Sequence, residues 1–249
     1  MPHASSLIES LRAFSYELPT AIADLIDNSI TAGARNIWID FNWDGENSVI
    51  SVTDDGKGMS EQQLVSAMRP GSRNPLEVRE PHDSGRFGLG LKTASFSQCR
   101  RVTVRSQVDG SEPATRCWDL DHIARVNEWQ LLRGADAAAN KQFNRLTELP
   151  HGTAVIWQKL DRLVANQHTD NEREQLMFLQ RANAVRDHLA MVFHQLMVGP
   201  RGVRLLLNQR LIKPWDPFLA NESATQVLPV TYLKLRGVTV EVEPFVLPH

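Results

Sequence analysis

The amino-acid sequence predicts an α/β fold, because helix-type and strand-type patterns alternate along the chain. Residues 17–34 place apolar side chains at helical spacing, with Pro19 in the first turn and Gly33 where a helix commonly ends. Two runs rich in β-branched and aromatic residues, 36–43 and 48–53, follow this helix. The Asp-Gly pair between them is a strong hairpin signal. The beginning of the chain therefore predicts a helix packed on an antiparallel strand pair.

The next part of the chain continues the alternation. Residues 60–68 begin with a Ser-x-x-Gln capping-box pattern and predict a short helix. Residues 69–87 are rich in proline, glycine and serine and lack periodicity, which is typical of a mobile loop. A helix over 89–99 leads into an alternating strand at 101–107, and two further strand-like runs lie at 114–120 and 153–160.

The composition changes after about Leu160. Residues 161–169 are polar and linker-like, and 170–198 predict a long helix stopped by Gly-Pro. Its apolar face is expected to consist of Leu176, Leu179, Leu189, Val192, Phe193 and Leu196. A hairpin is predicted from Val203–Leu207 and Leu211–Ile212, and a last strand at Val238–Val242. We therefore expect one domain over 1–160 and a second, α+β segment over 161–249 that is incomplete at its C-terminal end.

The composition narrows the class of protein. The chain has 249 residues, 42% hydrophobic, and a net charge of -2, which leaves no overall basic footprint for nucleic acid. The two cysteines, Cys99 and Cys117, form no ligand-spaced cluster, which favours a reduced compartment. A signal peptide and a membrane-spanning apolar run are both missing from the sequence. We expect a cytoplasmic protein with no membrane partner.

A polar stripe marks the first predicted helix. Asp24 and Asn28 are four residues apart, so both side chains leave the same helix face. A carboxylate there can orient or deprotonate a water, and an amide oxygen one turn further on can hold a magnesium ion. For an isolated pattern of this kind, a solvated helix face is the more common explanation.

The turn Asp54-Asp55-Gly56-Lys57-Gly58 follows a strand-like run. A carboxylate at a strand end can accept a hydrogen bond from an exocyclic amine, and the glycines allow the backbone to approach a flat ring. Met59 can pack on such a ring as a polarisable apolar surface. The turn lacks the regularly spaced oxygen ligands of a calcium loop of the EF-hand kind.

A glycine-rich stretch, SGRFGLGLKT, runs from Ser84 into the next predicted helix. Backbone amides at a helix start suit phosphate, and Lys92 can add a positive charge. The stretch is not a Walker A loop, because Leu91 lies between Gly90 and Lys92, and its glycine spacing is not that of a dinucleotide fingerprint.

The order of these features along the chain resembles the GHKL superfamily, named for gyrase, heat-shock chaperone, histidine kinase and MutL ATPases. A polar-striped helix, a D-x-G-x-G turn, a long loop, a G-x-x-G-x-G helix start and a late Gly-Thr occur in that order between about residues 10 and 160. The phrases AIADLIDNSI and GRFGLGLKTASFSQC, and the later HLAMVFHQLM and RLLLNQRLIKPWDPF, are most similar to Microrchidia-like prokaryotic ATPases. The resemblance implies a two-layer α/β sandwich of the Bergerat type, with a mixed, largely antiparallel sheet covered by helices, followed by the start of a transducer-like domain.

The resemblance also implies roles for individual residues. Asn28 would coordinate magnesium, and Asp54 would bind the adenine amino group of ATP, with Thr153 supporting it. Residues 69–87 would form a lid over the nucleotide. The remaining nucleotide contacts would come from Gly56, Gly58, Met59, Gly85, Arg86, Phe87, Gly88, Leu89, Gly90 and Lys92.

Asp24 is where the sequence departs from the family pattern, since many of these ATPases have glutamate as the base for water. Aspartate is one methylene shorter, and a misplacement of ~1 Å can cost on the order of 100-fold in rate. Lys213 and Lys234 are candidates, by location only, for the lysine that a transducer supplies to the γ-phosphate. We therefore expect slow ATP hydrolysis coupled to lid closure and to possible homodimerisation, within a larger machine associated with DNA or with defence.

Two alternatives remain open. The protein can be a nucleotide-gated switch that binds ATP and hydrolyses little of it. A sensor histidine kinase is the third reading, although only a short stretch precedes the first helix where a phospho-acceptor hairpin would lie.

Overall fold

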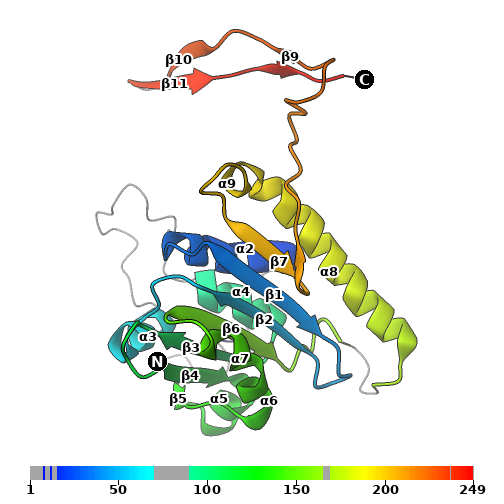
Figure 1. Cartoon of the computed structure of the whole chain (residues 1–249). Coiled ribbons are helices and arrows are strands. Elements are labelled where there is room, and N and C mark those ends of the chain that lie inside the picture. The colour runs from blue at the N-terminus through cyan, green and yellow to red at the C-terminus, as the bar shows by residue number, and fades with distance from the viewer. Residues whose placement is uncertain are drawn as a thin grey trace.

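The computed structural model describes residues 8, 12, 16–69, 90–164, 169–235 and 237–248. An eight-stranded sheet forms the centre of this part, in the order β5-β4-β3-β6-β2-β1-β7-β8 (Figure 1). Every neighbouring pair is antiparallel except β1 and β7, which are parallel. The strands are β1 (Asn36–Asn42), β2 (Val49–Asp54), β3 (Arg101–Gln107), β4 (Ala114–Asp119), β5 (Leu132–Arg133), β6 (Gly152–Gln158), β7 (Arg204–Leu207) and β8 (Arg210–Leu211). The α/β class and the mixed, largely antiparallel sheet are confirmed.

Three helices cover one face of the sheet: α2 (Leu18–Thr31), α4 (Gly90–Gln98) and α8 (Glu172–Val192) (Figure 1). β1 alternates between buried and half-buried residues over most of its length, as expected for a strand with one face on a core. Its buried residues lie in one apolar cluster with residues of the three helices and of β2, β3, β6 and β7. This layer pair holds the main core and positions α2 beside the ends of the strands.

Short helices cover part of the opposite face. They are α6 (Ala137–Asn140), the 3₁₀ helix η1 (Lys141–Phe143) and α7 (Asn144–Thr147). Phe143 and Leu146 pack there against Val49 of β2 and Ile156 of β6. β2 is therefore buried along its whole length, with both of its faces covered.

The predicted elements of the first part of the chain are confirmed. α2 spans most of the range predicted from its apolar stripe, and β1 and β2 form the predicted antiparallel pair. α3 (Glu61–Met68) begins with the predicted capping box, in which the Gln63 backbone N–H donates to Ser60 Oγ at 3.3 Å. The reciprocal bond runs from the Ser60 N–H to Gln63 Oε1 at 2.9 Å.

The apolar face predicted for the long helix is partly wrong. Its buried residues are Phe178, Ala182, Val185, Leu189 and Ala190. Leu176, Leu179, Val192 and Leu196 are instead exposed, with Leu176 at 57%. Buried positions follow i, i+4, i+7 and i+11 from Phe178, whose ring packs edge-on against Phe41 at 5.4 Å between centroids. The predicted set combined residues from two faces, because apolar side chains occur on both.

The chain beyond Leu160 continues into the same sheet and the same core. β7 pairs with β1, and the hairpin of β7 and β8 agrees with the predicted one. α9 (His194–Met197) follows α8, and Ile212 after β8 is 2% exposed.

Four short strands near the C-terminus stand apart from the main sheet (Figure 1). They are β9 (Gln226–Val227), β10 (Thr231–Leu235), β11 (Val238–Val242) and β12 (Phe245–Val246), and they form two separate two-stranded sheets. β11 confirms the last predicted strand. All residues of β10 are exposed, and the ring of Phe218 lies 5.0 Å from that of Phe245.

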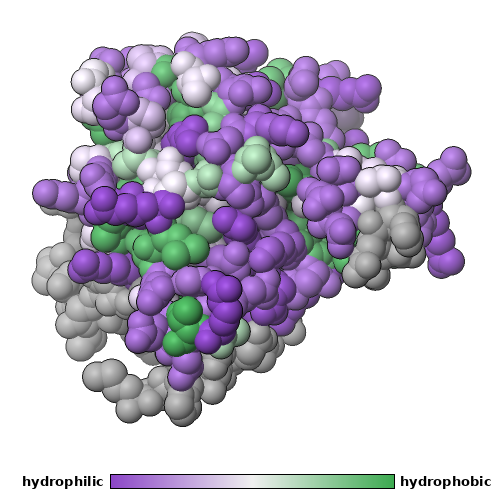
Figure 2. Space-filling view, turned by 90° about the horizontal axis from the view of Figure 1, so that it is seen from below, coloured by the Kyte–Doolittle hydropathy of each residue, from purple (hydrophilic) through white to green (hydrophobic). Residues whose placement is uncertain are grey.

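The face of the molecule opposite the C-terminal strands is predominantly hydrophilic, with smaller apolar areas between hydrophilic residues (Figure 2). Among the residues that the structure describes, no helix is both long enough and apolar enough to span a membrane.

Candidate functional site

α2 lies beside the end of the sheet where β2 and β3 end and β6 begins, because its Ser29 hydroxyl donates to Asp54 at the end of β2. The helix turns its apolar residues into the core, which leaves Asn28 exposed and Asp24 half-buried. Asp24 and Asn28 are brought to the same face of α2, as predicted from their spacing.

Asp54 is the buried carboxylate at this end of the sheet, at the end of β2 and only 6% exposed. Its Oδ1 accepts a hydrogen bond from the Gly56 N–H at 2.9 Å, and its Oδ2 accepts one from the Ser29 hydroxyl at 2.8 Å. Burial raises the pKa of Asp54, and the hydrogen bonds from Gly56, Ser29 and the Thr153 backbone oppose that shift. Since a carboxylate has about four lone-pair positions, Asp54 can accept a further hydrogen bond from a ligand amine.

Asp55 has a structural role, although it is next to Asp54 in the sequence. Its Oδ1 accepts from the backbone N–H groups of Arg35 and Asn36, at 2.7 and 2.8 Å. Its Oδ2 accepts from the Asn36 side-chain amide at 2.6 Å. The Lys57 N–H donates to the carbonyl of Ala32 at 3.0 Å, so the turn is fastened to the end of α2.

Gly58 is a position that only glycine fits. Its φ is +68°, and a Cβ added there would lie 1.9 Å from the carbonyl oxygen of Gln107 in β3. The next residue, Met59, donates its N–H to Ser106 Oγ at 2.8 Å, and Ser106 Oγ lies 2.7 Å from Thr153 Oγ1. The glycine turn is thus packed directly on β3 and β6, with the half-buried Met59 at its end.

The structure places Lys92 differently from the sequence expectation, which put its charge near phosphate. The side chain is 3% exposed, and its Nζ donates to the carbonyls of Ala67 at 3.0 Å and Arg69 at 2.6 Å. Trp118 Nε1 donates to the neighbouring carbonyl of Met68 at 2.9 Å. Burial lowers the pKa of Lys92 to about 8. Lys92 therefore fastens α4 to the end of α3.

Several predicted site residues lie outside the described part of the chain. These are Gly85, Arg86, Phe87, Gly88 and Leu89, together with the predicted lid apart from Arg69. Gly90 is the first residue of α4 that the structure describes.

Three residues that contact the site were missed in the sequence. Ser29 is a hydroxyl within the apolar stripe of α2, and Ser106 is the last inward position of an alternating strand. Both are polar residues at core positions, which is a detectable signal. Tyr16 precedes the helix, and its hydroxyl donates to Asp24 Oδ2. No pattern in the sequence marks it.

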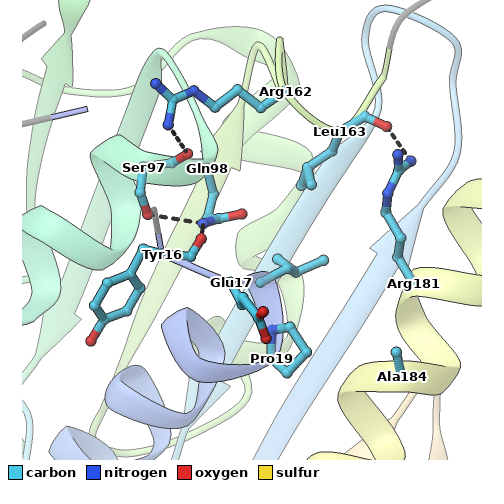
Figure 3. Close-up of a pocket in the computed structure, with 10 residues that line it drawn as sticks. Tyr16, Glu17, Pro19, Ser97, Gln98, Arg162, Leu163, Arg181 and Ala184 are labelled. Atoms are coloured by element: carbon cyan, nitrogen blue, oxygen red, sulfur yellow. Dashed lines mark hydrogen bonds between the residues drawn. The ribbon is translucent and has the colours of Figure 1, made fainter. Parts of the chain in front are cut away.

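A pocket of about 400 Å³ lies between the start of α2, the end of α4 and α8 (Figure 3). Arg162 Nη1 donates to the carbonyl of Ser97 at 3.3 Å at its rim, and Arg181 donates to the carbonyl of Leu163. Asp24, Asn28 and Asp54 do not line this pocket, whereas Tyr16, whose hydroxyl donates to Asp24, does.

The residues present suit magnesium held together with a phosphate ligand. Within the described ranges, no group of three or more His, Cys, Asp or Glu residues forms a metal site by itself. The exposed amide of Asn28 supplies a hard oxygen atom, and the half-buried carboxylate of Asp24 lies one turn before it on the same helix face. Magnesium commonly takes one or two protein oxygens and completes its shell with phosphate and water.

A buried carboxylate at a strand end and a glycine turn packed on the sheet, with a polar helix face on α2, fit the class of nucleotide-binding α/β proteins. Residues 16–153 match the model of the family described as histidine kinase-, DNA gyrase B-, and HSP90-like ATPases. The chain belongs to this family, which is the GHKL superfamily expected from its motifs.

Individual relatives agree with this assignment. The chain is 28% identical over 133 residues to the DNA mismatch repair protein MutL of Dictyoglomus turgidum. This alignment covers 53% of the chain and 23% of that protein. It is 32% identical over 91 residues to the ATPase morc-1 of Caenorhabditis elegans, covering 36% of the chain and 10% of the relative. The chaperone protein HtpG of Natranaerobius thermophilus is 32% identical to the chain over 109 residues, and this alignment covers 40% of the chain and 17% of HtpG. The chain thus aligns with less than a quarter of the length of these relatives.

Proposed function

We propose that the protein binds Mg-ATP at the end of the sheet where the central strands β2 and β3 end and β6 begins, and that it hydrolyses the nucleotide slowly. The observation that carries the proposal is Asp54, a carboxylate that is 6% exposed and held in place by Ser29 and Gly56. A buried carboxylate requires partners, and an exocyclic amine is a donor that its remaining lone pairs can accept.

The base would lie against the glycine turn. Gly56 and Gly58 keep the backbone free of side chains beside Asp54, and Met59 offers a half-buried apolar surface. Thr153 supports the same corner, because its backbone holds Asp54 and its hydroxyl is 2.7 Å from Ser106 Oγ.

The phosphates would lie between α2 and the start of α4. The N-terminus of α4, with Gly90 and the preceding glycine-rich stretch, suits anions because its backbone N–H groups and helix dipole favour negative charge. Asn28 would hold the magnesium ion, which when bound neutralises phosphate charge. Lys92 is not part of this proposal as a phosphate contact, since its amino group is bound to the end of α3.

Asp24 would act on the attacking water. It lies one helical turn before Asn28, so a water beside the terminal phosphate can donate a hydrogen bond to its carboxylate and lose a proton to it. The shorter side chain, compared with glutamate, supports a slow reaction.

We further propose that ATP orders residues 69–87 as a lid and favours a homodimer, as the motor part of a larger machine. The relative MutL is a DNA mismatch repair protein, which supports an association with DNA at the level of the family. A second candidate function is that of an ATP-gated switch with little turnover, which the aspartate at position 24 favours.

Isothermal titration calorimetry with Mg-ATP tests the base contact. Asp54→Asn keeps an oxygen for the Gly56 N–H but removes the charge, and we expect the Kd to rise roughly 10- to 150-fold, for the loss of ~1.5–3 kcal/mol. The control is Asp40→Asn on β1, a half-buried carboxylate that pairs with Arg145 at 3.6 Å and should bind ATP normally. Equal affinities for the two variants would contradict the role of Asp54. An intact chain that does not bind Mg-ATP at millimolar concentration would overturn the proposed function.

Phosphate release under steady-state conditions separates the enzyme from the switch. Turnover that is lost in Asp24→Asn and retained in Asp40→Asn supports the enzyme. Tight binding by the unmodified chain without measurable phosphate release supports the switch. Analytical ultracentrifugation with a non-hydrolysable ATP analogue measures the proposed dimer, and a monomer at every nucleotide concentration would contradict it.

A further inference from the structure

Tyr16, two residues before α2, reaches the carboxylate proposed as the base. The Tyr16 hydroxyl donates a hydrogen bond to Asp24 Oδ2. In the part of the chain that the structure describes, Asp24 makes no other side-chain hydrogen bond or ion pair. Among the described residues, Tyr16 is therefore the group that holds the rotamer of this carboxylate, through Oδ2.

Tyr16 is itself fixed from the direction of α4. Its backbone carbonyl accepts a hydrogen bond from Gln98 Nε2 at 2.6 Å, and the same nitrogen lies 2.9 Å from Ser97 Oγ (Figure 3). Gln98 is the last residue of α4 and is 3% exposed, so its amide has little freedom to move. The ring of Tyr16 is half-buried and packs against the main core.

Two residues from earlier in the chain, Arg12 and Ile8, also contact the body of the protein. Arg12 is 2% exposed and donates from Nη1 to the carbonyls of Phe96 at 3.0 Å and Cys99 at 2.8 Å. Its Nη2 lies 2.6 Å from Asp161 Oδ2. Ile8, four residues earlier, is 2% exposed within the main core. Residues 8, 12 and 16 are thus all bound to the body of their own chain.

The protonation of Tyr16 suits a donor. Burial, together with the hydrogen bond to Asp24 and its negative charge, raises the pKa of Tyr16 to about 12. The hydroxyl therefore keeps its proton at neutral pH and donates to the carboxylate.

We propose that Tyr16 is a positioning residue for Asp24, held in cis by the end of α4, and that it compensates for the short aspartate side chain by fixing its carboxylate. The inference rests on the proposed ATPase function for its effect on rate, whereas the contact itself is independent of nucleotide. Because α4 also begins at the glycine-rich stretch, Tyr16 joins the far end of the phosphate-binding helix to the carboxylate on α2. Tyr16 acts through Asp24 and requires no contact with ATP.

Spectroscopy of the nucleotide-free protein tests the contact. The chain has two tyrosines, and the other one, Tyr232, is 64% exposed, so Tyr232→Phe leaves a single ¹³Cζ tyrosine signal, from Tyr16. In this background at neutral pH, Asp24→Ala should move the Tyr16 signal several-fold further than Asn28→Ala, which changes the next turn of the same helix face. Equal shifts in the two variants would overturn the proposal.

Kinetics test the consequence. Tyr16→Phe removes only the hydroxyl, and we expect kcat for ATP hydrolysis to fall on the order of 10-fold while the Kd for Mg-ATP stays within about twofold. Tyr232→Phe is the matched control and should keep both values. An unchanged kcat in Tyr16→Phe would overturn the positioning role, as would an equal loss of binding and turnover, which indicates a general structural effect.

The two readouts separate failure of this inference from failure of the proposed function. If the unmodified chain binds no ATP, the proposed function falls, and the ¹³C experiment still decides whether Tyr16 holds Asp24. If the chain hydrolyses ATP and the Tyr16 signal ignores Asp24→Ala, the proposed function stands and this inference is wrong.

Discussion

Replacing Gly58 with alanine should destabilise the protein strongly, by an amount that the structure allows to be divided into two parts. The first part is conformational, because alanine at φ +68° costs about 1–2 kcal/mol. The second is steric, since the new Cβ would lie 1.9 Å from the oxygen and 2.6 Å from the carbon of the Gln107 carbonyl. Those atoms belong to β3, which is paired on both sides, so they cannot turn away as a side chain would. Relief of such overpacking costs roughly a further 1–3 kcal/mol.

Gly33 provides the matched control. Its φ is +81°, and a Cβ added there meets no atom within 4 Å, so Gly33→Ala should show the conformational cost alone. Urea unfolding followed by the fluorescence of the six tryptophans gives both free energies, provided that the slope m is unchanged. We expect Gly58→Ala to lose at least ~1 kcal/mol more than Gly33→Ala, or to fail to fold while Gly33→Ala folds. Equal losses would refute the close packing of the turn on β3.

Three further predictions concern the core and its buried ionisable groups. Phe178→Ala should cost about 3–5 kcal/mol of unfolding free energy. Leu179→Ala, at a residue that is 39% exposed, should cost under about 1 kcal/mol. Urea unfolding measures both values, and the reverse order would support the helix face predicted from the sequence. Because the pKa of Lys92 is lowered to about 8 from 10.5, the unfolded chain holds the extra proton between these pH values. The stability of the unmodified protein relative to Lys92→Met should therefore rise with pH across this window, by up to about 3 kcal/mol, and a flat difference would contradict the burial of the amine. Cys99 and Cys117 are 0% and 1% exposed, and burial raises the pKa of both thiols, so neither should react with Ellman's reagent until urea unfolds the chain.

Local signals were sufficient to predict much of the fold from the sequence. Three signals act over only a few neighbouring residues: the proline and glycine at the ends of α2, the Asp-Gly turn between β1 and β2, and the capping box at Ser60. Such signals predict an element without knowledge of its partners. The α/β class followed from their order.

The remaining parts depended on tertiary contacts. Residues 120–147 form α5 (Leu120–Val126), β5 and three short helices, whose apolar positions are too few to show a period. The buried face of α8 was predicted wrongly because the ring of Phe178 packs against those of Phe41 and Trp43, while leucines on another face of the helix are exposed. The sequence of the helix alone does not show which of its two apolar faces is buried.

The candidate site shows the same division. The spacing of Asp24 and Asn28 and the turn after Asp54 were read directly from the sequence, because each set lies on one element. Lys92 was expected at the phosphates, and its buried contact with α3 comes from a residue pair 23 positions apart. Tyr16 could not be selected, since only the packing of the chain on α4 brings its hydroxyl to Asp24.

The parallel pairing of β1 with β7 has a practical consequence for anyone who shortens this chain. The family match ends at residue 153, and the composition changes near Leu160, so either point invites a cut. A fragment ending there would leave the backbone groups of β1 without their neighbour and would uncover the side of α2 on which α8 packs. An unpaired apolar edge of this kind promotes aggregation. The smallest fragment expected to stay monodisperse therefore extends through Ile212, and hydrogen exchange at β1 would compare the two lengths directly.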